Sequence, residues 1–169
     1  PRPVEVYSDN PTQEAIERHG KELFGKIGCT VCHVPDLGGV SGIYSDFLLY
    51  VLDNPHPPGG GSGPGGGYGP RPPLPVEREL PDDLPRPEEW KTPPLWGVVD
   101  SAPYFHDGAS PTLESAILRH QGDARAVTEA YRKLSSTDQQ AIIRFLKTLK
   151  APADAIPLRD TNITKLSKR

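Results

Sequence analysis

The first regular pattern of apolar positions lies near the N-terminus. Thr12 is a suitable N-cap for a helix. After it, apolar residues and one glycine recur every three or four positions, at Ile16, Gly20, Leu23, Phe24 and Ile27. This spacing predicts an amphipathic helix. Gly20 lies on its apolar face and, having no side chain, allows a second helix to approach closely.

A second amphipathic helix is predicted over residues 137–149. Ser136 caps it, and the carboxylate of Asp138 suits its first turn. Its buried stripe consists of Ile142, Phe145, Leu146 and Leu149. We expect this helix to be the one that packs against Gly20.

Two shorter patterns fall between these helices. Residues 44–52 predict a short helix with one apolar side. Farther along, Ser110 and Pro111 begin another helix, which Gly122 ends. One face of this helix carries Leu113, Ala116, Ile117 and His120. His120 is therefore expected to point in the same direction as apolar side chains.

The amino-acid composition of one internal segment differs from that of the rest of the chain. Its 169 residues suffice for one domain with a core, but only 35% are hydrophobic, and 21 are proline and 17 glycine. Proline and glycine are concentrated in residues 54–88, which predicts an insertion without a packed core. We therefore expect an N-terminal extension (1–11), a single domain containing the insertion (12–150), and a C-terminal tail (151–169).

Charge and hydropathy exclude some partners. A formal net charge of -3 argues against nucleic acid, which would favour a concentrated basic patch. The basic run at 165–169 is typical of a solvated tail. No apolar run reaches the roughly 20 residues of a membrane span. We expect neither a nucleic-acid partner nor a membrane span in this chain.

One short motif dictates a specific chemistry, Cys29-Thr-Val-Cys32-His33. Two thiols at this spacing can add to the two vinyl groups of one porphyrin, and the adjacent imidazole then binds the iron. The other interpretations are a redox dithiol or half of a zinc site, but zinc needs four ligands and the chain has no second cysteine pair. The motif predicts one haem c, attached through Cys29 and Cys32.

The haem c motif also bears on location. Haem c is attached outside the cytoplasm in bacteria, so we expect a periplasmic or otherwise extracytoplasmic protein. The chain starts at Pro1 without a methionine. That start suggests a processed protein or a domain of a longer one.

The second axial ligand decides whether the iron carries electrons or binds a substrate. The chain contains no methionine, which excludes the common His/Met pair. A lone buried histidine is more often a hydrogen-bonded core residue, but we favour His120, because a histidine on an apolar helix face suits an iron that lacks a sixth ligand. His106 is the next candidate, followed by His19 and His56.

Several ordered segments resemble the C-terminal haem domain of the di-haem cytochrome c peroxidase superfamily, most closely its di-haem oxidoreductase branch. They are Lys91-Thr-Pro-Pro-Leu-Trp-Gly97, Ser101-Ala-Pro-Tyr-Phe-His-Asp-Gly108 and Thr112-Leu-Glu-Ser-Ala-Ile-Leu-Arg-His120. With shorter matches around residues 32–35 and 44–49, the resemblance covers residues 12–150 apart from the insertion. In the superfamily the position of His120 carries the distal ligand, so the resemblance implies a bis-histidine haem.

A second resemblance concerns the fold. Gly20-x-x-x-Phe24 ahead of the haem motif is similar to class I cytochromes c, in which an N-terminal helix crosses a C-terminal one beside the haem. It implies an all-α, class I cytochrome c-like helical domain around one covalent haem, with a long Pro/Gly-rich loop.

Four further residues are candidates for the haem pocket. The carbonyl of Pro35 is a possible acceptor for the Nδ1 proton of His33. Trp96 and Tyr104 belong to the family-like segments and line either the pocket or the ordinary core. His106 lies in a turn that resembles a haem-proximal loop of the family, where an imidazole bonds to a propionate or to backbone; a surface histidine is the alternative. Trp90 has no predicted role.

The sequence thus predicts a mono-haem c-type cytochrome, or such a domain of a larger protein, which transfers electrons through a low-spin bis-His haem. Its partner would be a redox protein or a fused redox domain. The family carries two Cys-x-x-Cys-His motifs and this chain has one, so the peroxide-handling haem would be the missing one. The alternatives are a peroxidase-like haem domain with a labile distal ligand and a gas-binding sensor.

Overall fold

The structure is a computed structural model that describes residues 4–52, 84–85 and 88–151. The predictions for His56, for most of the insertion at 54–88 and for the tail beyond Ala151 lie outside these residues.

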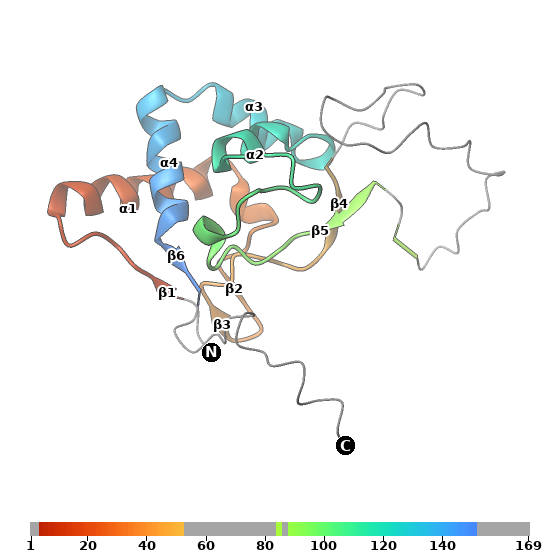
Figure 1. The fold of residues 1–169 in the computed structure, drawn as a ribbon, viewed down its shortest axis with the longest axis horizontal. Coiled ribbons are helices and arrows are strands. Elements are labelled where there is room, and N and C mark those ends of the chain that lie inside the picture. The colour runs from red at the N-terminus through yellow and green to blue at the C-terminus, as the bar shows by residue number, and fades with distance from the viewer. Residues whose placement is uncertain (1–3, 53–83, 86–87, 152–169) are drawn as a thin grey trace, which may run out of the picture.

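The described residues form four α-helices, three 3-10 turns and six short strands (Figure 1). The helices are α1 (Pro11–Lys26), α2 (Leu113–Arg119), α3 (Arg125–Arg132) and α4 (Ser136–Thr148). The turns are η1 (Cys29–Val31), η2 (Val98–Asp100) and η3 (Gly122–Ala124).

The strands pair into three two-stranded antiparallel sheets. The first joins β1 (Val4–Glu5) to β6 (Leu149–Lys150), the second joins β2 (Asp36–Leu37) to β3 (Val40–Ser41), and the third joins β4 (Leu49–Val51) to β5 (Glu89–Lys91). The prediction of an all-α domain is therefore wrong, and the fold mixes helices with small sheets. Strands of two or three residues are too short to show an alternating pattern, and two of the three pairs join distant parts of the chain.

The short helix predicted over residues 44–52 is also wrong. The Ser45 hydroxyl accepts a hydrogen bond from the Phe47 N–H, and the Asp46 carboxylate accepts one from the Leu48 N–H. Such local side-chain bonds compete with helix formation. Residues 49–51 then pair with β5, and Tyr50 lies opposite Trp90.

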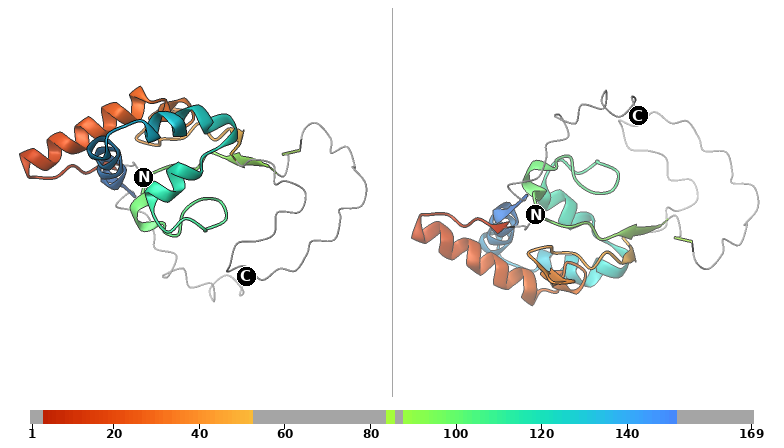
Figure 2. Two further views of the ribbon diagram at one scale, coloured as in Figure 1. Left: turned by 90° about the horizontal axis from the view of Figure 1, so that it is seen from above. Right: turned by 90° about the horizontal axis from the view of Figure 1, so that it is seen from below.

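The predicted packing of the N-terminal helix against the C-terminal one is confirmed. Helix α1 begins at Pro11 with Asn10 as its cap, and α4 is capped by Ser135, so both begin slightly earlier than predicted. The two helices cross, and Figure 2 shows α4 almost end-on against α1. At the crossing, a Cβ on Gly20 would overlap the backbone carbonyl of Ala141, so only glycine permits this approach.

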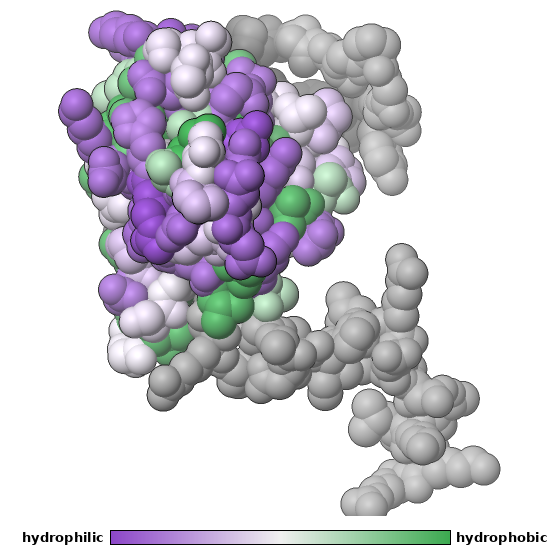
Figure 3. Space-filling view, turned by 90° about the vertical axis from the view of Figure 1, so that its left-hand side faces the viewer, coloured by the Kyte–Doolittle hydropathy of each residue, from purple (hydrophilic) through white to green (hydrophobic). Residues whose placement is uncertain are grey.

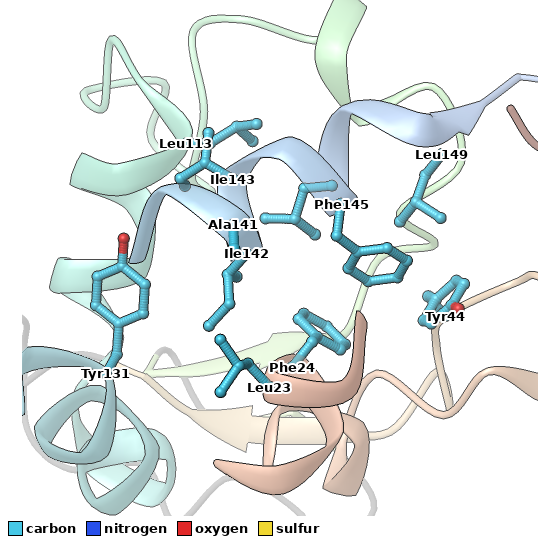
Figure 4. Close-up of a cluster of buried hydrophobic side chains, with 11 residues drawn as sticks. Leu23, Phe24, Tyr44, Leu113, Tyr131, Ala141, Ile142, Ile143, Phe145 and Leu149 are labelled. Carbon is cyan, nitrogen blue, oxygen red and sulfur yellow. The ribbon is translucent and has the colours of Figure 1, made fainter. Parts of the chain in front are cut away.

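Three aromatic rings occupy the core at this crossing (Figure 4). Phe24 of α1 lies 5.4 Å from Phe145 of α4 and 6.0 Å from Tyr44, measured between ring centroids, and Tyr44 lies 5.6 Å from Phe145. All three contacts have the edge-to-face geometry that aromatic rings prefer. The cluster fixes Tyr44, which follows the haem motif, to the helix crossing.

The face viewed in Figure 3, on the α1 and α4 side, is mainly hydrophilic.

The helix crossing can be tested by two glycine-to-alanine substitutions in α1. Gly20→Ala should destabilise the protein by about 1–3 kcal/mol, because the new methyl group overpacks a backbone contact. Gly25 lies in the same helix with nothing within 4 Å of its Cβ position. Gly25→Ala should therefore be neutral or stabilising by up to about 1 kcal/mol. Thermal unfolding of the two variants measures the difference, and equal melting temperatures would refute the packing argument.

Candidate haem site

The Cys29-x-x-Cys32-His33 motif forms one tight turn directly after α1. Gly28 has φ of 100°, a left-handed conformation that favours glycine, and it redirects the chain into η1. The N–H of Cys32 and the N–H of His33 both donate to the carbonyl of Cys29, the latter at 3.0 Å. The two thiols and the imidazole thus come from a single turn, as attachment to one porphyrin requires.

The two thiols are not activated as a redox pair would be. Burial raises the pKa of the Cys29 thiol to about 12 and also raises the pKa of Cys32. Reactive dithiols need the opposite shift, since the thiolate is the nucleophile. Within the described residues, no three His, Cys, Asp or Glu side chains gather as a metal-ion site. The described residues therefore favour neither a redox dithiol nor half of a zinc site at this motif.

His33 is held by one hydrogen bond. Its Nδ1 lies 3.0 Å from the backbone carbonyl oxygen of Tyr44, so the ring proton resides on Nδ1 and donates to that oxygen. Burial lowers the pKa of His33 to about 4; the bond to Tyr44 opposes this shift, and the nearby imidazole of His120 adds to it. His33 is therefore a neutral imidazole whose Nε2 lone pair is available to a metal, which is the ligand form of histidine.

The hypothesis that Pro35 accepts the His33 proton is wrong. The carbonyl of Pro35 instead accepts the backbone N–H of Ile43 at 2.9 Å. Tyr44 has φ of 49°, an uncommon value for a residue with a side chain. Its carbonyl is the one that lies against the His33 ring, and the sequence alone contains no signal for that backbone conformation.

Tyr44 is fixed in turn by a polar network that reaches the N-terminal strand. Its hydroxyl donates to Glu5 of β1 at 2.6 Å, and Lys21 of α1 donates to both Glu5 oxygens at 2.8 Å. The Tyr7 hydroxyl donates to the same carboxylate. Burial acts to raise the pKa of Glu5, but the hydrogen bonds from Lys21, Tyr44 and Tyr7 hold it below its usual value. The network ties β1 and α1 to the residue that orients His33.

His120 is oriented in a similar way by a different element. It is the C-cap of α2, and its Nδ1 lies 2.7 Å from the backbone carbonyl of Ala116, one turn earlier. Burial lowers the pKa of His120, with a smaller contribution from the charge of Arg119. The hydroxyl of Thr128 in α3 donates to the His120 carbonyl. Here too the proton on Nδ1 is engaged, and Nε2 remains free of hydrogen bonds to any described residue.

The boundaries of α2 differ slightly from those predicted. Thr112 caps the helix in a capping box with Ser115, so Ser110 and Pro111 precede it. The helix ends at Arg119, before Gly122. Gly122 has φ of 55°, and a Cβ there would overlap the carbonyl of Val51, so this glycine allows β4 to approach the segment that follows His120.

A loop before α2 packs against the His120 ring. Phe105 meets this ring edge-to-face, with centroids 5.4 Å apart. The guanidinium of Arg119 lies 4.4 Å from the centroid of the Phe105 ring and donates to both carboxylate oxygens of Asp107, at 2.9 and 2.6 Å. The Arg119 guanidinium also donates a hydrogen bond to the hydroxyl of Ser110, at 3.1 Å. Hydrogen bonds from Arg119 hold the pKa of Asp107 well below its usual range.

The other predicted site residues lie outside this arrangement or at its edge. His106 stacks on Trp90, with centroids 3.7 Å apart and planes 6° from parallel, and adjoins Phe105. His19 bonds to Asp138 on the surface.

Tyr104 and Trp96 are both part-buried. The Tyr104 hydroxyl donates to the carbonyl of Val99, and its backbone pairs with Ser110. Trp96 precedes the left-handed Gly97. Sequence reasoning missed Tyr44, Phe105 and Arg119 as supporting residues. The Phe-His-Asp-Gly turn pointed to the loop that contains Phe105, but not to Tyr44.

These residues fit a haem. Two imidazoles, those of His33 and His120, are each held through Nδ1 by a backbone carbonyl and leave Nε2 without a hydrogen bond to any described residue. Two thiols adjoin one of them. A porphyrin supplies four nitrogen ligands, so two imidazoles complete six-coordinate iron. The arrangement defines a haem cytochrome-type domain.

Comparison with known proteins agrees with this class. Residues 78–149 match the family described as "Di-haem oxidoreductase, putative peroxidase", which confirms the resemblance predicted from the sequence. The matched segment includes His106 and His120 but not residues 29–33, so covalent attachment rests on the motif alone.

A solved structure of hydrazine synthase from Kuenenia stuttgartiensis, pressurised with xenon, shares the fold, with a TM-score of 0.54 and 24% identity. The similarity covers 87% of this chain and 50% of that one, so the chain spans half the length of this neighbour. No curated protein matches the chain. Among the described residues, no helix has the length and apolar character needed to cross a membrane.

The network around Glu5 predicts a pH-dependent stability. Because the folded-state pKa of Glu5 is lowered, its ionised form stabilises the fold above the ordinary value of 4.5, and this contribution is lost as the pH falls through the folded-state pKa. Glu5→Gln should lower the melting temperature by a few degrees near about pH 7 and much less near about pH 3.

Glu22→Gln is the matched control, because Glu22 is exposed on α1. Thermal melts of the three proteins at both pH values test the network. An equal loss at the two pH values, or an equal effect of Glu22→Gln, would show that the Glu5 charge does not stabilise the fold.

Proposed function

We propose that this chain is a mono-haem c-type cytochrome domain that transfers electrons through a low-spin, bis-histidine iron. His33 and His120 would be the axial ligands, and Cys29 and Cys32 would bind the porphyrin covalently. The observation that carries the proposal is the shared geometry of the two histidines. Each gives its Nδ1 proton to a backbone carbonyl and keeps Nε2 for a metal.

The haem would supply the redox chemistry by cycling between ferric and ferrous iron. The protein would supply ligation, orientation and burial. Because both imidazoles are held by backbone carbonyls, they would move little between oxidation states. Two imidazoles lack the thioether of methionine, so the reduction potential would lie below that of a His/Met cytochrome.

The proposal extends to location and partners. Covalent haem attachment by this motif supports a periplasmic or otherwise extracytoplasmic protein. The electrons would pass to or from a redox partner protein or a redox domain in the same polypeptide.

A second candidate function is a peroxidase-like domain, which the description of the matching family favours. In that case His120 would leave the iron and open a position for peroxide. Turnover of peroxide by the isolated domain would support this function, and inertness of the ferrous protein to carbon monoxide would support electron transfer. The same carbon monoxide experiment tests the gas-sensor alternative.

Substitution of His120 tests the ligand assignment. Wild-type ferric protein should give a low-spin EPR signal, and His120→Ala should convert most of it to high-spin, because only a weak ligand or none remains on the distal side. His19→Ala is the matched control and should leave the signal unchanged, since His19 bonds to Asp138 on the surface. A low-spin signal that persists unaltered in His120→Ala would overturn the assignment.

A further inference from the structure

The proposed distal ligand lies at the end of a short, weakly supported helix. Helix α2 has seven residues, and His120 follows its last residue in an extended conformation, with φ of -64° and ψ of 109°. Isolated helices of this length are unstable in water, so contacts from other elements must hold the end of α2. The contacts that hold it therefore decide whether the imidazole stays on the iron.

On one side, α3 and Leu52, the residue that follows β4, provide that support. The Thr128 hydroxyl binds the carbonyl of His120 at 2.5 Å, and the backbone N–H of Gln121 donates to the carbonyl of Leu52 at 2.8 Å. These bonds fix the main chain at His120. They make no contact with the face of the imidazole.

On the other side, one residue of the loop formed by residues 105–110 contacts the ring. Phe105 meets His120 edge-to-face. Phe105 also has φ of 72°, a left-handed conformation that is unusual for a bulky residue and persists only where its surroundings enforce it. The loop therefore does not hold this position by its own conformational preference.

Arg119 is the residue that binds this loop to α2. Its guanidinium forms two hydrogen bonds to Asp107, a third to Ser110, and lies over the ring of Phe105. The pairing with Asp107 uses both carboxylate oxygens, which makes it directional as well as ionic. Ser110 is fully buried, so this contact anchors the guanidinium to the interior end of the loop.

We propose that Arg119 is a positioning residue that keeps His120 on the haem iron, by fixing the Phe105–Ser110 loop against the imidazole through Asp107. This inference rests on the proposed bis-histidine haem. It assigns the stability of the closed, six-coordinate iron to the ion pair between Arg119 and Asp107. When the pair breaks, Phe105 is released and the imidazole gains freedom to leave.

The experiment measures binding of carbon monoxide to the ferrous holoprotein, because carbon monoxide binds only when a ligand position is open. Arg119→Gln and Asp107→Asn each break the pair. The side chains of both residues are about one-third exposed, so the pair is partly screened. The fraction of protein in which His120 has left the iron should rise roughly three- to tenfold in either variant, and the rate of carbon monoxide binding should rise with it.

Asp107→Glu keeps the ion pair and should retain most of the wild-type resistance to carbon monoxide. The matched control is Arg18→Gln. Arg18 also pairs with a carboxylate, Glu14, and lies 4.4 Å from an aromatic ring centroid, that of Tyr7, but it belongs to α1. This variant should leave the binding rate unchanged, whatever its effect on melting temperature.

His120→Ala separates failure of this inference from failure of the proposed function. If His120→Ala binds carbon monoxide rapidly while Arg119→Gln and Asp107→Asn behave as wild type, Arg119 has no positioning role and the bis-histidine proposal stands. If His120→Ala is as inert as wild type, His120 is not the ligand and both proposals fail. Should Arg119→Gln not fold, the comparison of Asp107→Asn with Asp107→Glu decides.

Discussion

The site depends first on the hydrogen bond between His33 Nδ1 and the backbone carbonyl of Tyr44. This bond selects the tautomer of the imidazole, sets the plane of its ring and leaves Nε2 for a metal. Tyr44 can offer its carbonyl because its ring packs against Phe24 and Phe145 at the crossing of α1 and α4. The proximal side of the site is therefore an extension of the hydrophobic core, and the close approach at Gly20 makes it possible.

The distal side is built differently. His120 depends on a seven-residue helix, on one hydroxyl of α3 and on a loop that an ion pair holds in place. Contacts of this kind are weaker than core packing, since surface ion pairs contribute little to stability. In the bis-histidine haem that we propose, this asymmetry makes His120 the ligand that would leave the iron more easily.

The sequence was informative where chemistry or periodicity is local. The Cys29-x-x-Cys32-His33 spacing, the two long helices and the placement of His120 at the end of a helix could all be predicted from nearby residues. Gly20 marked the face on which the helices cross. The three small sheets could not, because two of them join distant segments through strands of two or three residues. The acceptor for His33 was missed because it depends on the left-handed conformation of Tyr44, which no residue pattern indicates. Arg119 and Asp107 lie 12 positions apart, and their pairing depends on the loop between them.

The central claim is that His33 and His120 bind the same iron. Electron-nuclear double resonance of the ferric protein, with isotopically labelled histidine nitrogen, measures it directly. The account predicts two strongly coupled histidine nitrogens in the wild-type protein and one in His120→Ala. A single coupled histidine nitrogen in the wild type, or two that persist in His120→Ala, would contradict it.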